Sequence, residues 1–213
     1  MKSIQIIAYL FFFVFGFCIC LLYLSKISSD WVTACSTFIL AFSILITILN
    51  NRDFYEIKRR EKTIDLMKDW NYNLDAKNSL SRKFAEQLSE EELKKILKEK
   101  EFIIKDSDNI EILKNIFEEY VDKNGIVNNK ISALLRWELI KYLNKLENIC
   151  SAWYYHVVDR KLIESEFIYL FQHGNTALKK VREIEEDSFP CIDLFEKTMK
   201  DRFKLKIEEK NKL

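Results

Sequence analysis

One histidine in this sequence stands beside a carboxylate and a guanidinium at helical spacing. Asp159 follows His156 by three positions and Arg160 follows it by four, so a helical backbone would make the three side chains neighbours. A histidine beside a carboxylate could act as a general acid or base, or bind a metal. No nucleophile, second histidine or cysteine stands at ligand spacing, so we predict no metal site and no cofactor. We favour a capped and salt-bridged corner between two helices over catalysis by these residues.

RNA cleavage is a second chemistry that can be tested against the histidines. The small helical RNases called HEPN carry an arginine five positions before a histidine. Ser151 stands five positions before His156, and Ile168 stands five positions before His173. The motif is absent in its standard form, so a divergent RNA-acting domain is kept as an alternative hypothesis.

Polar side chains interrupt the apolar face of the densest helical segment, about 131–158. Asn144, Glu147 and Asn148 fall at helix-neighbour spacing, and Arg136 lies earlier in the same segment. We predict that these four residues form a polar network that fixes packing against a facing helix. A binding or catalytic face is the alternative interpretation.

Two uncharged apolar runs near the start of the chain decide most of the architecture. Ile4 to Leu24 contains 21 residues without a formal charge, and Trp31 to Leu49 contains 19. A helix of roughly 20 apolar residues crosses a hydrocarbon core, so we predict a transmembrane hairpin with spans at about 4–24 and 31–49. The first run is longer than the core of a signal peptide, about 7–15 residues, and no A-x-A site follows it.

Basic residues near the spans predict the orientation of this hairpin. The loop between the runs has one lysine, Lys26, and the N-terminus has Lys2. The second run is followed by a larger basic group, Arg52, Lys58, Arg59, Arg60 and Lys62. Since positive residues stay on the cytoplasmic side, we expect both termini in the cytoplasm.

Small polar residues form a stripe along the second run. They are Thr33, Ser36, Ser43, Thr47 and Asn50, at spacings that place them on one side of a helix. Such residues let membrane helices approach closely and hydrogen-bond across the interface. The stripe is interpreted either as packing against the first span, or as the inner face of an oligomer, where it would meet neighbouring copies or line a pore. Neither run contains a charged residue, which disfavours a coupled transporter.

Composition limits the fold class and the partners of the part of the chain that follows the two apolar runs. From Asn50 onward the chain carries 32 basic and 32 acidic residues, so it lacks the basic surplus typical of nucleic-acid binders, and we expect no nucleic-acid partner. The whole chain has only 3 glycines and 1 proline, which favours helices over hairpins. The five cysteines form no C-x-x-C pair, so we predict reduced, buried thiols and no cysteine site.

We therefore predict an all-α protein with a transmembrane hairpin (1–50), a juxtamembrane helix and turn (51–80) and a cytoplasmic helical domain (81–213). The second span should continue as one helix to about Trp70, followed by a turn around 71–81. Capping residues and breakers then place six helices at about 90–100, 108–122, 131–158, 162–171, 175–186 and 192–209.

The motif Leu143-Asn144-x-x-Glu147, followed by the run Val158 to Ile163, resembles an uncharacterised domain family of small bacterial membrane proteins. Members of that family have two N-terminal spans and a basic exit such as Arg52 to Lys62. A similar group is the transmembrane accessory protein of type VI-B CRISPR systems, which assists an RNA-guided RNase and assembles into membrane rings. The resemblance implies a bacterial inner-membrane location, a homo-oligomer, a protein partner in antiviral defence and pore formation. This sequence lacks the HEPN arginine–histidine pairing attributed to such proteins.

Three function hypotheses follow. The first is a non-enzymatic inner-membrane protein that self-associates and couples its cytoplasmic body to the lipid bilayer. The second is a membrane-tethered, divergent RNA-acting domain that depends on His156. The third is a passive anchor for a partner protein, which needs neither the stripe nor the histidine.

Overall fold

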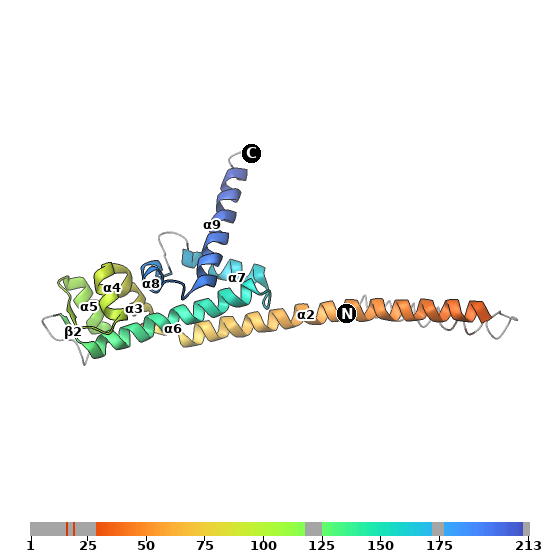
Figure 1. Cartoon of the computed structure of the whole chain (residues 1–213), viewed down its shortest axis with the longest axis horizontal. Coiled ribbons are helices and arrows are strands. Elements are labelled where there is room, and N and C mark those ends of the chain that lie inside the picture. The colour runs from red at the N-terminus through yellow and green to blue at the C-terminus, as the bar shows by residue number, and fades with distance from the viewer. Residues whose placement is uncertain (1–15, 17–18, 20–28, 118–124, 172–176, 211–213) are drawn as a thin grey trace. The chain divides into compact units, whose positions relative to one another are not determined.

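The computed structural model describes residues 16, 19, 29–117, 125–171 and 177–210 (Figure 1). This part of the chain is mostly helical, which confirms the predicted all-α class. The chain divides into two units, residues 1–56 and 57–213, and each is described by itself. The predicted first span lies outside the described residues except for Gly16 and Ile19. The two-span hairpin therefore stays a prediction.

Helix α2 (Ser29–Asn73) runs without a break from the second apolar run into the charged part of the chain. No glycine or proline occurs between its ends, so nothing in the sequence interrupts its backbone hydrogen bonds. This confirms that the second run continues as one helix to Trp70. Within the described ranges, α2 is the one helix long and apolar enough to cross a membrane, and its apolar window is not buried.

Helix α3 (Ala76–Gln87) corrects the turn predicted around 71–81. Only two residues separate α2 from α3, and the Asp75 side chain caps α3 by accepting a hydrogen bond from Asn78 N at 2.8 Å. Asn78 and Ser81, which lie within the predicted turn, are buried on the inner face of the helix. Ser81 Oγ donates to Lys77 O, and Asn78 Nδ2 donates to Glu138 O at 2.8 Å. These bonds satisfy the Ser81 hydroxyl and the Asn78 amide nitrogen at buried positions of the helix.

Two short capped helices follow. The capping box of Ser89 and Glu92 begins α4 (Glu90–Leu97), as the sequence predicts. Asp106 caps α5 (Ser107–Ile116). The predicted helix 108–122 ends at Ile116, because Phe117 leaves helical geometry and buries its side chain in the core. The remainder of that predicted segment, 118–122, lies outside the described residues.

A pair of two-residue strands interrupts the helices. Strand β1 (Phe102–Ile103) pairs antiparallel with β2 (Ile126–Val127). The low glycine content predicted no paired strands. A single glycine, directly before β2, supplies the backbone conformation that this pairing contains. Gly125 has φ +71°, and a Cβ at this position would lie 2.6 Å from the carbonyl oxygen of Ile104. Only glycine combines that conformation with so close an approach.

Helix α6 (Asn129–Tyr154) is the centre of the body, and α3, α4, α7 and α9 pack against it (Figure 1). Its buried face contains Ile131, Leu135, Leu139, Leu143, Leu146, Ile149 and Trp153. The sequence places its end near Val158, but the helix ends at Tyr154. His156 has φ 59°, Val157 N donates to Ala152 O, and His156 N donates to Trp153 O. This is a Schellman motif with histidine in the place that glycine usually occupies.

The C-terminal part contains α7 (Arg160–Phe167), a 3-10 turn η1 (Ile168–Phe171), α8 (Lys179–Ile184) and α9 (Pro190–Lys210). The single helix predicted at 162–171 is therefore an α-helix that tightens into a 3-10 turn. Helix α8 is shorter than the predicted 175–186, because Ala177 and Leu178 before it have positive φ. Pro190 is the first residue of α9, where its missing N–H costs nothing.

Candidate functional site

The predicted small-polar stripe lies on the exposed surface of α2. Thr33, Ser36, Ser43, Thr47 and Asn50 are all exposed. Ser43 Oγ donates to Ile39 O, and Thr47 Oγ1 donates to Ser43 O, each at 2.9 Å. These two hydroxyls are therefore satisfied by their own helix, as serine and threonine commonly are in membrane helices. What they offer to a neighbour is mainly a small side chain that permits close approach.

The histidine corner places His156 beside Arg160, while Asp159 begins the next helix. His156 Nε2 lies 3.2 Å from Arg160 Nη1. Asp159 Oδ1 accepts hydrogen bonds from Lys161 N at 3.1 Å and Leu162 N at 3.3 Å, so its carboxylate caps α7. A guanidinium is always protonated, so it donates to the imidazole nitrogen and does not accept a proton from it. The geometry therefore lacks the histidine–carboxylate contact that would activate a base.

The same corner is tied to α2 through a residue that the sequence analysis missed. Thr63 is fully buried. Its Oγ1 accepts a hydrogen bond from Asp159 N at 2.8 Å and donates to Arg59 O at 2.7 Å. Arg60 Nε lies 3.9 Å from Asp159 Oδ2. The turn between α6 and α7 is thus fixed to the C-terminal part of α2, and no local signal could show this because 96 residues separate the partners.

A second group of contacts closes the corner against α9. The Arg160 guanidinium lies over the Trp153 ring, 4.2 Å from its centroid. Trp153 Nε1 donates to Glu164 Oε1 at 2.8 Å, and Glu164 Oε2 pairs with Arg202 of α9. The Trp153 ring also packs edge-on against Phe195 of α9. The corner is therefore an anchored junction of α2, α6, α7 and α9.

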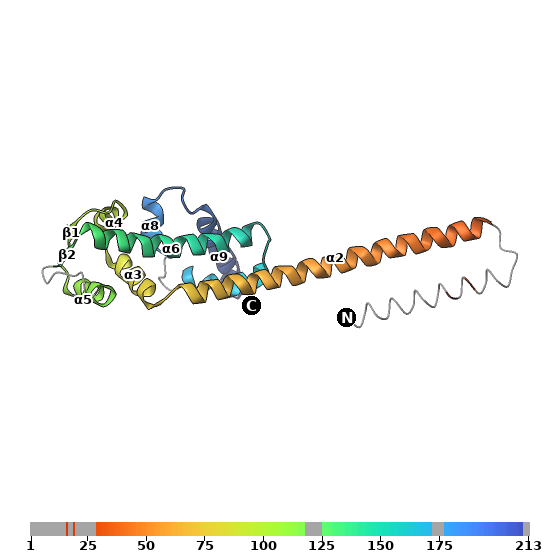
Figure 2. The ribbon, with the colours of Figure 1, turned by 90° about the horizontal axis from the view of Figure 1, so that it is seen from below.

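The C-terminal end of α2 lies antiparallel along α6 (Figure 2). Trp70, only 8% exposed, packs against the rings of Tyr142 and Phe167 at centroid distances of 5.3 and 5.2 Å. Asp69 Oδ2 pairs with Lys145 Nζ at 2.6 Å. Together with the Thr63 hydrogen bonds, these contacts join α2 to the body over more than one helical turn.

The four residues predicted to form one polar network are not brought together. Arg136 pairs with Glu99 at 3.1 Å, near the opposite end of α6. Asn144 and Asn148 are exposed. Glu147 alone bridges two helices: its two carboxylate oxygens accept hydrogen bonds from Cys191 N at 3.0 Å and Ile192 N at 2.9 Å. A negative side chain at these amides caps the N-terminus of α9 from another helix.

We expect Glu147→Ala to lower the free energy of unfolding by about 1–3 kcal/mol, because two part-buried amides of α9 lose their acceptor. Urea unfolding of the full chain in detergent, followed by tryptophan fluorescence, measures this. Asn148→Ala is the matched control, since Asn148 is exposed on the same helix and its loss should change the stability by less than about 0.5 kcal/mol. Equal effects of the two substitutions would contradict the capping role of Glu147.

A buried arginine is the strongest polar feature that the sequence analysis did not find. The Arg182 side chain on α8 is 3% exposed and pairs with Asp193 and Glu196 of α9, the latter at 2.6 Å. Its Nε donates to Ala177 O at 3.2 Å. Burial alone would raise the pKa of Glu196, but hydrogen bonds from Lys200 and Arg182, with their charges, lower the pKa below its ordinary value.

The two body cysteines are free thiols beside the Glu147 carboxylate. Burial, and then the charge of Glu147, raise the pKa of Cys150 well above its ordinary value, and the same causes raise the pKa of Cys191. Both residues therefore stay protonated near neutral pH, which disfavours a nucleophilic role. Across the described residues no group of three or more His, Cys, Asp or Glu side chains is arranged to hold a metal ion.

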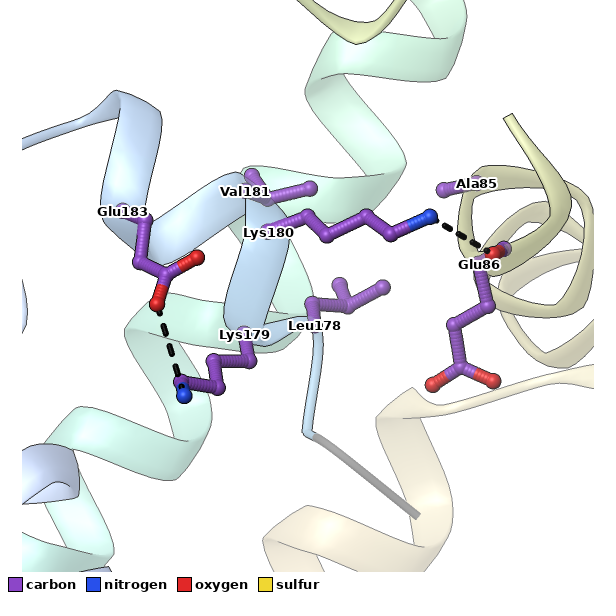
Figure 3. Close-up of a pocket in the computed structure, with 7 residues that line it drawn as sticks. All are labelled: Ala85, Glu86, Leu178, Lys179, Lys180, Val181 and Glu183. Atoms are coloured by element: carbon purple, nitrogen blue, oxygen red, sulfur yellow. Dashed lines mark hydrogen bonds and ion pairs between the residues drawn. The ribbon is translucent and has the colours of Figure 1, made fainter. Parts of the chain in front are cut away.

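A pocket of about 210 Å³ lies between α3 and α8 (Figure 3). Its two lysines are occupied by neighbouring groups. Lys180 Nζ donates to Leu88 O at 3.1 Å, where it covers the carbonyl end of α3, and Lys179 pairs with Glu183 at 3.4 Å. The pocket is therefore a contact between two helices in which both lysines already have partners.

No family model, curated protein or solved structure matches this chain.

Proposed function

We propose that this chain is a non-enzymatic inner-membrane protein that self-associates through α2 and couples its cytoplasmic helical body to the bilayer. The observation that carries the proposal is the continuity of α2, which passes from the apolar run into the body contacts at Thr63 and Trp70 without a break. A continuous helix transmits a displacement of the body to the membrane segment, because its backbone hydrogen bonds leave no flexible joint.

The chemistry of the corner supports a structural role for it over a catalytic one. Asp159 caps α7, and His156 ends α6 in a left-handed conformation beside Arg160. Each of these side chains has a bond that shapes the junction. In the proposed assembly Thr33, Ser36, Ser43 and Thr47 face inward, and movement of the body opens or closes a pore. The resemblance stated above connects such an assembly with antiviral defence.

The decisive experiment is the mass and image of the detergent-solubilised full chain. A ring or other defined multimer is the result expected from the proposal. A particle of monomer mass at every concentration would contradict it and favour the passive anchor.

Replacing both Ser36 and Ser43 by leucine should change the oligomer size or the permeability of the membrane. Overfilling a close helix contact costs about 1–3 kcal/mol per site, which is roughly tenfold or more in an association constant. Ala41→Leu is the control, because Ala41 is a small, exposed residue of the same run that lies off the stripe. Dye leakage from cells and the mass of the purified particle are the measurements. If the double variant behaves as the control does, the stripe is not the inner face of an assembly.

A further inference from the structure

The stripe of α2 does not stop at the end of the apolar run. Alternating steps of three and four residues continue its spacing along α2 into the charged part of the helix, with the slow drift that a left-handed supercoil compensates. The whole series is Thr33, Ser36, Leu40, Ser43, Thr47, Asn50, Phe54, Ile57, Glu61 and Ile64, and every member is exposed. We call this series the α2 seam. A repeat of seven residues with two seam positions is the pattern of a left-handed coiled coil.

The cytoplasmic half of the α2 seam points away from the body. Ile57 and Ile64 are 54% and 47% exposed, although both are large apolar side chains. The residues of α2 that pack on the body, Thr63, Leu66 and Trp70, occupy the opposite side of the helical repeat. A partner could therefore cover the seam without displacing any contact between α2 and α6.

Charges beside the α2 seam identify what covers it. Each heptad of a parallel coiled coil has two seam positions, called a and d. The residue directly before position a of one helix faces the residue five places later on the other helix. Applied to two copies of α2, this rule pairs Asp53 with Lys58 and Arg60 with Asp65. Both pairs have opposite charge. Within one chain Lys58 pairs with Glu61 at 2.8 Å, so a second copy would add Asp53 to the same lysine.

We propose that a second copy of this chain occupies the seam, with two α2 helices in a parallel, in-register coiled coil over residues 50–65. The inference rests on the self-association proposed above and names its contact. Copies inserted in one membrane with the same topology hold α2 parallel and at the same depth, so each seam layer meets its own counterpart. Ile57 and Ile64 supply apolar layers of this contact.

Charge exchange tests this contact directly. Asp53→Lys and Lys58→Asp should each raise the dissociation constant of the full-length particle roughly tenfold, because each turns two attractive pairs of the dimer into repulsive ones. The double variant should restore the wild-type value, since its pairs are again opposite in charge. The measurement is the concentration dependence of particle mass in detergent at low salt.

The controls make the same charge changes off the seam. Glu56→Lys and Lys62→Asp are matched to the two variants, and both residues are exposed on α2. If the seam variants weaken association no more than these controls, or if the double variant fails to restore it, the coiled coil is wrong while self-association stands. If the wild-type chain is a monomer throughout, both proposals fail.

Glu61 gives an independent test, because it is the one charged residue within the seam. Two copies in register would bring two Glu61 carboxylates together, and like charges at facing positions oppose association. Glu61→Leu should therefore lower the dissociation constant several-fold in the same measurement. Weaker association of Glu61→Leu would overturn the proposed register.

Discussion

Replacing Arg182 by methionine is expected to destabilise the body by about 3 kcal/mol, because it leaves a buried carboxylate without its main partner. The Glu196 side chain is only 11% exposed, and Lys200 on the same helix is its remaining cation. Arg182 also holds the carbonyl of Ala177 before α8. Urea unfolding of the full chain in detergent measures the effect, and the fluorescence of Trp153, which packs on α9, reports it.

The pH dependence of this variant distinguishes lost ion pairing from lost packing. The pKa of Glu196 is lowered in the folded chain, so its contribution to stability is present above the unfolded pKa of about 4.5 and is lost as the pH falls through the folded pKa. Arg182→Met should raise the folded pKa of Glu196. The free energy of unfolding of this variant should then fall less than that of the wild type as the pH is lowered.

Two comparisons make the Arg182 prediction falsifiable. Arg202→Met removes an arginine that is 50% exposed and pairs with Glu164, so it should cost less than about 1 kcal/mol. A double variant, Arg182→Met with Glu196→Met, should recover part of the loss, because it removes the uncompensated charge as well. An Arg182→Met chain as stable as the Arg202→Met chain would show that the buried pairs contribute nothing.

Local rules explain which parts of the fold could be predicted. Ser89, Asp106 and Asn128 each accept a hydrogen bond from an amide two or three residues later, so the start of each helix is encoded next to its cap. The continuity of α2 also follows from local sequence, because it contains no glycine or proline. The error at Asn78 has the opposite cause. An asparagine favours a turn or a buried helix position depending on whether a distant acceptor, here Glu138, is within reach.

In the candidate site, too, local sequence predicts some contacts, while others depend on residues far away in the chain. His156 and Arg160 are neighbours, as their spacing predicts, but no single helix holds both residues. The direction of the Asp159 carboxylate depends on where α7 begins. The contact between Thr63 and Asp159 joins positions 96 residues apart, and periodicity carries no information about such a pair. Arg182 gave no signal, since a basic residue in a charged segment looks solvated until tertiary packing buries it.

The α2 seam is predictable in part from local sequence and in part only from the tertiary structure. Its seven-residue spacing is present in the sequence alone, yet a repeat does not say which side of the helix the body covers. Burial of Thr63 and Trp70 supplies that information and leaves Ile57 and Ile64 on the opposite side. The inference of a paired α2 therefore needs the sequence for its period and the structure for its direction.

Replacing Trp70 by alanine should release the C-terminal end of α2 from the body. Trp70 fills the space between Tyr142 and Phe167, and removing a buried tryptophan costs about 3–5 kcal/mol. Because Trp70 joins α2 to the remainder of its unit, we expect faster amide hydrogen exchange over residues 63–73 and a lower midpoint of urea unfolding. The loss should spread to the pair of Asp69 with Lys145, which depends on the same helix position.

The control for this change is Tyr72→Ala, two residues further along the same helix. Tyr72 is 89% exposed, so its removal should alter stability by less than about 0.5 kcal/mol. Particle mass separates the two proposed roles of α2. Trp70→Ala should keep the wild-type oligomer, because the seam lies on the other side of the helix, while membrane permeability ceases to depend on the body. If membrane permeability still depends on the body in a Trp70→Ala chain whose α2 is released, coupling through this helix is contradicted.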